Sequence, residues 1–299
     1  MTKKRHSEAV LSDLRDQWWG QDYLELVAKR LQLPHRQSVL DVGCGQGHWG
    51  QRLLPLMQDG AVLEGIDQER DWVSRAQERS RSLGLAERCH YCQGDATELP
   101  YEDESFDLVT CQTLLMHLAD PMAALREMLR TLKPGGTLLL AEPSNTSNQF
   151  STDTVNRTLS PADISEIANL LLSCSRGRAS LGRGDDSIGD VLPVMLSRLG
   201  LQDIRSFQND RTSDVLPPYS EVIRAQLDEE TGHAKSGFWL WNKDDARSLY
   251  EAGGGEMTRF ERGYSCFLRK STIFEEQVQA ETYARTGGGH HYLIVAEKR

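Results

Sequence analysis

A short glycine-rich segment near residue 45 constrains the fold of this chain more than any other feature. Three glycines stand at alternate positions, Gly43, Gly45 and Gly47, directly after the apolar and acidic residues 39–42. Glycine is favoured where the backbone turns sharply or passes close to a ligand, because it has no Cβ to clash. The segment therefore predicts a buried strand, a tight turn, and a helix that begins at about His48.

The spacing of these glycines separates the turn from two other nucleotide-binding loops. A Walker loop ends in Gly-Lys-Ser/Thr, whereas Gly47 is followed by His48. The dinucleotide fingerprint reads G-x-G-x-x-G, and here the last glycine comes one residue early. Asp41, just before the turn, would repel a pyrophosphate and attract a cation. The pattern favours a nucleoside that carries positive charge over a dinucleotide.

Strand and helix patterns alternate along most of the chain. The predicted strands are 38–42, 61–66, 88–93, 106–111, 136–142, 201–208 and 292–296, and the predicted helices between and before them are 21–31, 48–57, 70–83, 121–132 and 191–199, the last capped by Asp190. Alternating units of this kind demand an α/β fold with a parallel sheet and helices on both faces. Ligands of such sheets bind at the carboxyl ends of the strands.

Further motifs follow the glycine turn in a constant order, at 62–67, 94–96, 106–112 and 132–136. Together with the turn, they resemble the class I S-adenosylmethionine-dependent methyltransferases. Within that family, the small-molecule enzymes of the ubiquinone and menaquinone biosynthesis type are the nearest match. The resemblance covers about 36–145 and resumes at 188–213 and 286–299. It implies a Rossmann-like sheet with S-adenosylmethionine as cofactor.

The resemblance also implies roles for individual residues. The Asp67 carboxylate is expected to accept hydrogen bonds from the ribose hydroxyls, since an ionised acid only accepts. The expected cofactor contacts are Asp41, Gly43, Cys44, Gly45, Gly47, Asp67, Gln68, Asp95, Ala96 and Gln112. His117 and Glu142, near the ends of the fourth and fifth strands, are candidates for a catalytic base, and a purely structural role is the alternative for each. No metal site is predicted.

The Rossmann-like core is interrupted by two insertions. The expected division is 1–35 for an N-terminal segment and helix, 36–145 for the cofactor-binding core, 146–187 for an insertion, 188–216 for more of the core, 217–286 for a helical insertion, and 287–299 for the last core strand. Long insertions in a compact domain usually carry function. Both are therefore predicted to form a lid that closes over the bound substrate.

Local signals predict structure inside the insertions. Ser160 and Asp163 form a capping box for a helix, and Thr272 with Glu275 reads as a second one. The Gly-, Arg- and Ser-rich stretch 175–186 is predicted to be a loop. The triple glycine at 253–255 is predicted to be a flexible joint.

Four of the six tryptophans lie in two short segments outside the predicted sheet, Trp18-Trp19 and Trp239-Leu240-Trp241. Such pairs can line a pocket for a flat, apolar or cationic molecule. The alternative is that they pack the N-terminal helix and the second insertion onto the sheet.

Composition limits the class of partner. The chain has 299 residues and a net charge of −10, with 34 basic against 44 acidic side chains. This balance argues against a broad nucleic-acid-binding face. No apolar stretch approaches the roughly 20 residues that cross a membrane, and six dispersed cysteines suit a reducing compartment. We expect a cytoplasmic protein with a small-molecule partner, and a homodimer is kept as an alternative.

These expectations combine into one functional hypothesis with two rivals. The hypothesis is methyl transfer from S-adenosylmethionine to a small molecule by direct displacement. One rival is a tRNA or protein methyltransferase. The other is a cofactor-binding regulator or partner subunit that has lost activity. The identity of the acceptor and of the attacking atom is left open.

Overall fold

The computed structural model describes residues 16, 18–149, 153–210, 212, 214–287 and 289–299. The chain divides into two compact units, each described here by itself. Unit 1 contains the described residues of Met1–Ser144, Ser187–Arg211 and His290–Arg299, and unit 2 those of Asn145–Asp186 and Thr212–Gly289. The expected N-terminal range 1–35 lies only in part within the described residues.

The described strands of unit 1 form one seven-stranded sheet in the order β3-β2-β1-β4-β5-β7-β6. Their bounds are Ser38–Val42 for β1, Val62–Asp67 for β2, Cys89–Gln93 for β3, Phe106–Gln112 for β4, Leu132–Pro143 for β5, Arg205–Gln208 for β6 and His291–Glu297 for β7. Strands β1 to β5 run parallel, while β7 is antiparallel to both β5 and β6. The predicted α/β, Rossmann-like class is confirmed.

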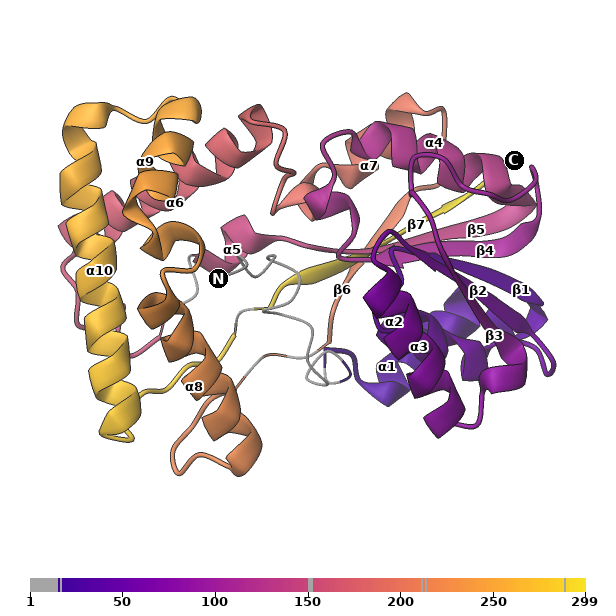
Figure 1. Cartoon of the computed structure of the whole chain (residues 1–299), viewed down its shortest axis with the longest axis horizontal. Coiled ribbons are helices and arrows are strands. Elements are labelled where there is room, and N and C mark those ends of the chain that lie inside the picture. The colour runs from indigo at the N-terminus through magenta and orange to yellow at the C-terminus, as the bar shows by residue number, and fades with distance from the viewer. Residues whose placement is uncertain (1–15, 17, 150–152, 211, 213, 288) are drawn as a thin grey trace. The chain divides into compact units, whose positions relative to one another are not determined.

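Helices cover both faces of this sheet (Figure 1). They are α1 (Gln21–Arg30), α2 (His48–Leu53), α3 (Arg70–Ser82), α4 (Pro121–Thr131) and α7 (Leu192–Arg198). One buried cluster joins α1, α2 and α3 to one face, and a second joins α4 and α7 to the other. Side chains of a strand alternate between the two clusters, as in β1, where Val39 belongs to the first and Leu40 to the second.

Several predicted boundaries in unit 1 need correction. The helix predicted over 48–57 ends at Leu53 and passes into a 3₁₀ turn, Leu54–Leu56, that contains Pro55, because proline has no N–H for a helical bond. The strand predicted from 136 already begins at Leu132. The sixth strand contains only Arg205–Gln208 of the predicted 201–208.

The predicted cap at Asp190 is wrong. Asp190 ends a 3₁₀ turn that begins at Ile188, and α7 starts two residues later with no side-chain cap. The Asp190 carboxylate instead accepts a hydrogen bond of 3.1 Å from the Ser144 hydroxyl. It therefore ties the start of this segment to the end of β5.

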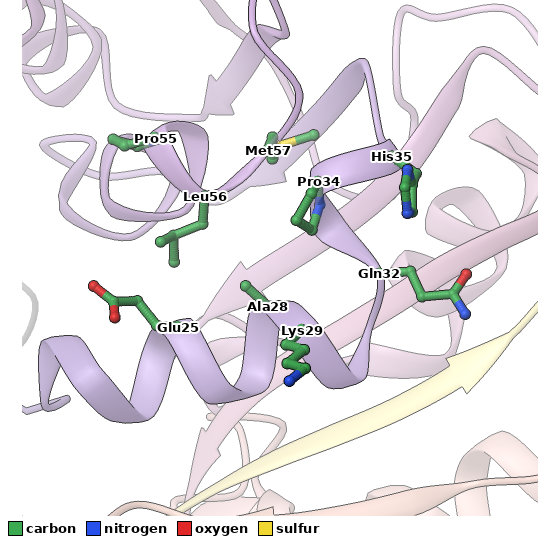
Figure 2. Close-up of a pocket in the computed structure, with 9 residues that line it drawn as sticks. All are labelled: Glu25, Ala28, Lys29, Gln32, Pro34, His35, Pro55, Leu56 and Met57. Atoms are coloured by element: carbon green, nitrogen blue, oxygen red, sulfur yellow. The ribbon is translucent and has the colours of Figure 1, made fainter.

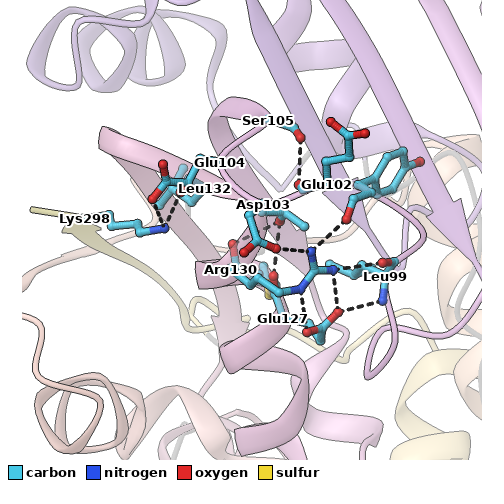
Figure 3. Close-up of polar contacts among 12 residues, drawn as sticks. Leu99, Glu102, Asp103, Glu104, Ser105, Glu127, Arg130, Leu132 and Lys298 are labelled. Carbon is cyan, nitrogen blue, oxygen red and sulfur yellow. Dashed lines mark hydrogen bonds and ion pairs between the residues drawn. The ribbon is translucent and has the colours of Figure 1, made fainter.

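An arginine on α4 organises the connection between β3 and β4 (Figure 3). Arg130 donates to the carboxylates of Glu127 and Asp103, each at 2.8 Å, and to the carbonyls of Tyr101 and Leu99 at 2.8 and 2.9 Å. One guanidinium can serve four acceptors because its donors form a fixed planar fork. The connection is thereby held against the helix.

Unit 2 is helical. Its helices are α5 (Asn145–Gln149), α6 (Pro161–Ser180), α8 (Glu221–Ser236), α9 (Lys243–Ala252) and α10 (Met257–Gln279), with a 3₁₀ turn at Trp239–Trp241. Side chains cap three of them: Ser160 before α6, Ser220 before α8 and Asn242 before α9. Helices α6, α9 and α10 share one buried cluster. In the described part of the chain, no helix has the length and apolarity needed to cross a membrane.

Three predictions inside unit 2 are wrong. The stretch 175–186 is not all loop, because α6 continues to Ser180. Thr272 does not begin a helix: it lies within α10 and its hydroxyl donates to the carbonyl of Leu268 at 3.2 Å. The triple glycine is not an open joint throughout, since a Cβ on Gly253 would collide with the Ser173 carbonyl and one on Gly255 with the Tyr250 ring, whereas nothing lies within 4 Å of a Cβ on Gly254. Tertiary packing overrides local composition at these positions.

Packing onto the sheet describes Trp19, whereas Trp239 and Trp241 pack against the helices of their own unit. Trp19 is 1% exposed, and its ring lies 5.6 Å from that of Trp49 and 6.1 Å from that of Tyr23. In unit 2, Trp239 and Trp241 pack against the cluster of α6, α9 and α10, and the Trp241 indole donates to Ser271 at 3.0 Å. These side chains belong mainly to the cores of their units.

The close approach of α6 and α9 generates a prediction about stability. A Cβ on Gly177 would collide with the backbone carbonyl of Leu249. Gly177→Ala should therefore lower the free energy of unfolding by about 1–3 kcal/mol, as overpacking does. Gly232→Ala is the matched control, because Gly232 lies within α8 with nothing within 4 Å of a Cβ. It should be neutral or raise stability by about 0.5–1 kcal/mol. Equal effects in urea unfolding would contradict the close-packing argument.

Candidate functional site

The glycine turn joins β1 to α2 and is bound to the end of β2. Gly43, Gly45 and Gly47 all have positive φ, at 67°, 52° and 80°, a region that side chains disfavour. The N–H groups of Gly43 and Cys44 both donate to the carbonyl of Ile66, at 2.7 and 3.0 Å. The alternate spacing seen in the sequence is thus a run of left-handed residues that folds the backbone back onto β2.

Asp67, the last residue of β2, contacts the turn directly. One carboxylate oxygen accepts from the N–H of Gly45 at 2.9 Å, and the other accepts from the N–H of Glu69 at 2.9 Å. Burial raises the pKa of Asp67, and the Gly45 N–H opposes that shift. Each oxygen has a second lone pair, so the side chain can still accept from hydroxyl groups.

Asp41 lies beneath the turn and is 1% exposed. Its Oδ2 atom accepts from the N–H of Gly50 at 3.0 Å, while its Oδ1 atom is buried with no hydrogen-bond partner among the described residues. Burial raises its pKa to about 7, the Gly50 N–H lowers it, and the charge of Asp67 raises it further. An orphan buried oxygen is costly and marks a place where a donor is expected.

A small hollow lies beside this part of the turn. It is lined by Asp41, Gly43, Cys44, Gln46, His48, Trp49 and Gln112. Four of these, Asp41, Gly43, Cys44 and Gln112, are expected cofactor contacts that the fold brings together from β1, the turn and β4. Gln46, His48 and Trp49 were not predicted. Their only sequence signal was a position between or after the glycines.

The remaining expected cofactor contacts lie at the ends of β2 and β3. Gln68 is exposed, and its carbonyl accepts from the Gln93 side chain at 2.9 Å. Asp95 is also exposed and accepts from the N–H and hydroxyl of Thr97, at 2.8 and 2.7 Å, which lower its pKa. Ala96 is half-buried against the core. All three lie at the carboxyl edge of the sheet.

The turn after β4 has an unusual backbone. Thr113 is 8% exposed and has φ of 50°, which is rare for a β-branched residue. Such a conformation costs about 1–3 kcal/mol and persists only where the surroundings enforce it. Next to it, Leu114 packs on the glycine turn, because a Cβ on Gly43 would come within 2.6 Å of its side chain. The sequence did not reveal this contact.

The two candidates for a base have different surroundings. His117 ends the 3₁₀ turn Leu115–His117 and is half-buried. Glu142 is 0% exposed, and its Oε1 atom accepts from the N–H groups of Leu114 and Leu115 at 2.9 and 2.8 Å. Burial raises the pKa of Glu142 to about 7, against the opposing effect of those N–H groups.

A larger cavity of about 430 Å³ lies elsewhere in unit 1 (Figure 2). Glu25, Ala28 and Lys29 of α1 form one side of it, and the segments that precede β1 and β2 form the other. It therefore lies near the amino ends of these strands. Because ligands of parallel sheets bind at the carboxyl ends, this cavity is not the candidate site.

The geometry suits the cationic nucleoside that the sequence indicated. The turn offers backbone without side chains at Gly43 and Gly47, where a Cβ would meet Leu114 and Gln51. Asp41 supplies an unsatisfied acceptor beneath the turn for an ammonium group, and Asp67 supplies acceptors for hydroxyls. These two acceptors fit S-adenosylmethionine, which carries an ammonium, a sulfonium and a ribose but no phosphate.

Comparisons with known proteins agree with this geometry. Residues 35–179 match the family model described as a methyltransferase domain. The methyltransferase GfsG of Streptomyces halstedii is 37% identical over 123 residues, which are 41% of this chain and 44% of that protein. Demethylmenaquinone methyltransferase of Oceanobacillus iheyensis is 33% identical over 136 residues, 46% of this chain and 55% of that protein. The chain thus spans about half the length of these curated relatives.

Solved structures show the same fold at low identity. The crystal structure of the YcgJ protein from Bacillus subtilis superposes with a TM-score of 0.51 and 20% identity, over 92% of this chain and 97% of that one. A protein from Bacillus halodurans gives a TM-score of 0.52 and 20% identity, over 93% and 99%. The glycine turn, the sheet order and the matching family model agree: residues 35–179 belong to a methyltransferase domain, and the described fold is that of the class I S-adenosylmethionine-dependent methyltransferases.

Proposed function

We propose that the protein transfers a methyl group from S-adenosylmethionine to a small-molecule acceptor. The observation that carries this proposal is the glycine turn with its two acceptors, the orphan Oδ1 atom of Asp41 and the carboxylate of Asp67. When bound, the cofactor supplies a methyl group on a sulfonium, which is already a good leaving group. The protein then needs mainly to align the nucleophile, and proximity alone can contribute about 7–11 kcal/mol.

Different residues would contact different parts of the cofactor. Asp41 accepts from the ammonium, Asp67 accepts from the ribose hydroxyls, and Asp95 with Ala96 borders the adenine. Gln112 faces the hollow beside the methionine end. His117 is the candidate base, needed only if the acceptor is protonated at working pH; a base of this kind contributes on the order of 10²–10⁴-fold.

Two observations support a small-molecule acceptor. The net charge of −10 disfavours binding along a phosphate backbone. One relative is named demethylmenaquinone methyltransferase, a name that points to a small acceptor for that protein. Both agree with the prediction made from the sequence.

The direct test is a screen for methyl transfer from labelled cofactor. Metabolite extracts should yield a labelled small product, and bulk tRNA and protein fractions run beside them should not. Labelled tRNA or protein without a small product would overturn the acceptor class. Cofactor binding without transfer to any fraction would favour the regulator or partner subunit instead.

The role of Asp67 gives a second prediction. We expect micromolar binding of S-adenosylmethionine, roughly −8 kcal/mol, and weaker binding of NAD. Asp67→Ala should weaken cofactor binding by about 1.5–3 kcal/mol, because charge-assisted hydrogen bonds are lost. Asp107→Ala is the control: that carboxylate accepts from Ser38 and Lys133 at the start of β4, at the other edge of the sheet. Equal affinities of both variants in calorimetric titration would refute the assignment of Asp67.

Asp41 makes cofactor binding depend on pH. With a pKa of about 7 in the free protein, its carboxyl is mostly protonated at pH 6, and only the ionised form attracts an ammonium. Affinity should therefore rise with pH, by up to about eightfold between pH 6 and 7.5 if only the ionised form binds. Asp41→Asn should bind more weakly and show a flat profile over this range. The pH dependence of folding has the opposite sign to that of binding. Because the pKa of Asp41 is higher in the folded than in the unfolded chain, its contribution to the free energy of unfolding falls as pH rises from about 4 to about 7.

Unit 2 gives a prediction about dynamics. We propose, as the sequence suggested, that this unit closes as a lid when cofactor and acceptor bind, since lids commonly exclude water and complete the site. Amide exchange within 153–186 and 214–287 should then slow when both ligands are added. Unchanged exchange throughout these residues, with the cofactor demonstrably bound, would contradict a lid.

A further inference from the structure

The turn after β4 needs an external restraint. Thr113 adopts a left-handed backbone that a β-branched residue disfavours, and its N–H donates to the carbonyl of Ala141 on β5 at 2.9 Å. Leu114 follows and packs against Gly43 of the glycine turn. If the Thr113 backbone relaxed, the Leu114 side chain would therefore move, and its packing against the glycine turn would change.

Glu142 supplies that restraint from the buried side. Its Oε1 atom accepts from the N–H groups of Leu114 and Leu115 and from the thiol of Cys111 at 3.6 Å. These N–H groups open a 3₁₀ turn, so they have no partner within it. The Oε2 atom is buried and has no hydrogen-bond partner among the described residues. One carboxylate oxygen thus holds two consecutive backbone donors.

We propose that Glu142 is a positioning residue for the glycine turn, the loop that is proposed to bind the cofactor. By binding the N–H groups of Leu114 and Leu115, it holds Thr113 in its strained conformation and keeps the Leu114 side chain against Gly43. This inference rests on the proposed function, because it assigns Glu142 an effect on S-adenosylmethionine binding. It replaces the catalytic-base role that the sequence suggested for this residue.

Burial argues against proton transfer by Glu142. The residue is 0% exposed and, unlike Asp41, does not line the hollow at the glycine turn, whereas a base must come within hydrogen-bond reach of the acceptor's proton. Its cross-strand neighbour on β7 is Tyr292, which packs in the same buried cluster as Leu114 and Leu115. The side chain points into this packed layer, and its accessible chemistry is to accept hydrogen bonds.

Substitutions at Glu142 separate the two roles. Glu142→Gln keeps an acceptor for Leu114 and Leu115, and Glu142→Leu removes it. We expect Glu142→Gln to raise the cofactor Kd less than about threefold and to retain most of kcat, and Glu142→Leu to raise Kd about tenfold. Tyr292→Phe is the matched control for a change in the same layer and should leave Kd unchanged. A loss of kcat of about 100-fold or more in Glu142→Gln, with Kd unchanged, would show a base and overturn the proposal.

The pathway through Leu114 is tested independently. Leu114→Ala should also raise Kd, and its combination with Glu142→Leu should raise Kd by less than the product of the two single effects, because both act through one contact. If Kd of the double variant rises by the full product of the two single effects, the two residues are not coupled and the proposal fails. If Glu142→Leu does not fold, Glu142→Asp takes its place in the double variant, because its shorter side chain draws the acceptor away from both N–H groups.

Amide exchange distinguishes this failure from a failure of the proposed function. In the ligand-free protein, the N–H groups of Leu114 and Leu115 should exchange at least about tenfold faster in Glu142→Leu than in Tyr292→Phe, because their acceptor is gone. Equal exchange would overturn the restraint itself. Fast exchange in a protein whose wild type binds no S-adenosylmethionine would keep the restraint but reject the cofactor assignment.

Discussion

Two N–H groups that share one carbonyl oxygen underlie the candidate site. Gly43 and Cys44 both donate to Ile66, and this pair folds the chain back onto β2 as soon as β1 ends. Only then can Asp67, one residue after Ile66, reach the N–H of Gly45. The left-handed glycines are the means by which the backbone makes this reversal without a steric penalty.

The same constraint orders the neighbouring strands. Because the turn lies over the ends of β1 and β2, the segment after β4 must pass close beside it, and Leu114 occupies the space that a side chain at Gly43 would fill. Strand β5 then supplies Glu142 from the other side of that segment. Two consecutive contacts, of Glu142 with the Leu114 N–H and of the Leu114 side chain with Gly43, connect a buried carboxylate to the loop that is proposed to bind the cofactor.

The sequence predicted most of unit 1 and little of the detail in unit 2. Apolar runs located β1 to β5 to within a few residues of their bounds. A strand that is buried on both faces carries apolar side chains on both, and therefore appears in the sequence as such a run. In unit 2, Gly177 reads as a loop residue although it permits the contact of α6 with α9. Thr272 resembles a cap although its hydroxyl bonds to the preceding turn of its own helix. Such long-range packing leaves no local signature.

Within the candidate site, the sequence indicated the glycine turn and its two acidic neighbours but not Gln46, His48 and Trp49 or the geometry. The glycines, Asp41 and Asp67 carry a spacing that can be read directly. The sequence offered Glu142 as a candidate base, but its burial and the strain at Thr113 depend on which strands become neighbours, and single residues give no sign of that. A threonine after a strand or a glutamate at a strand end is ordinary until their partners are known.

The position of β7 has a consequence for the order in which the chain can assemble. This strand, His291–Glu297, lies between β5 and β6, so it separates two strands that are made long before it. During synthesis, β5 leaves an open edge while all of unit 2 emerges, and exposed edges invite wrong pairing. The described elements of unit 2 are helices and turns, so unit 2 offers few strands that could pair with this edge before β7 is made.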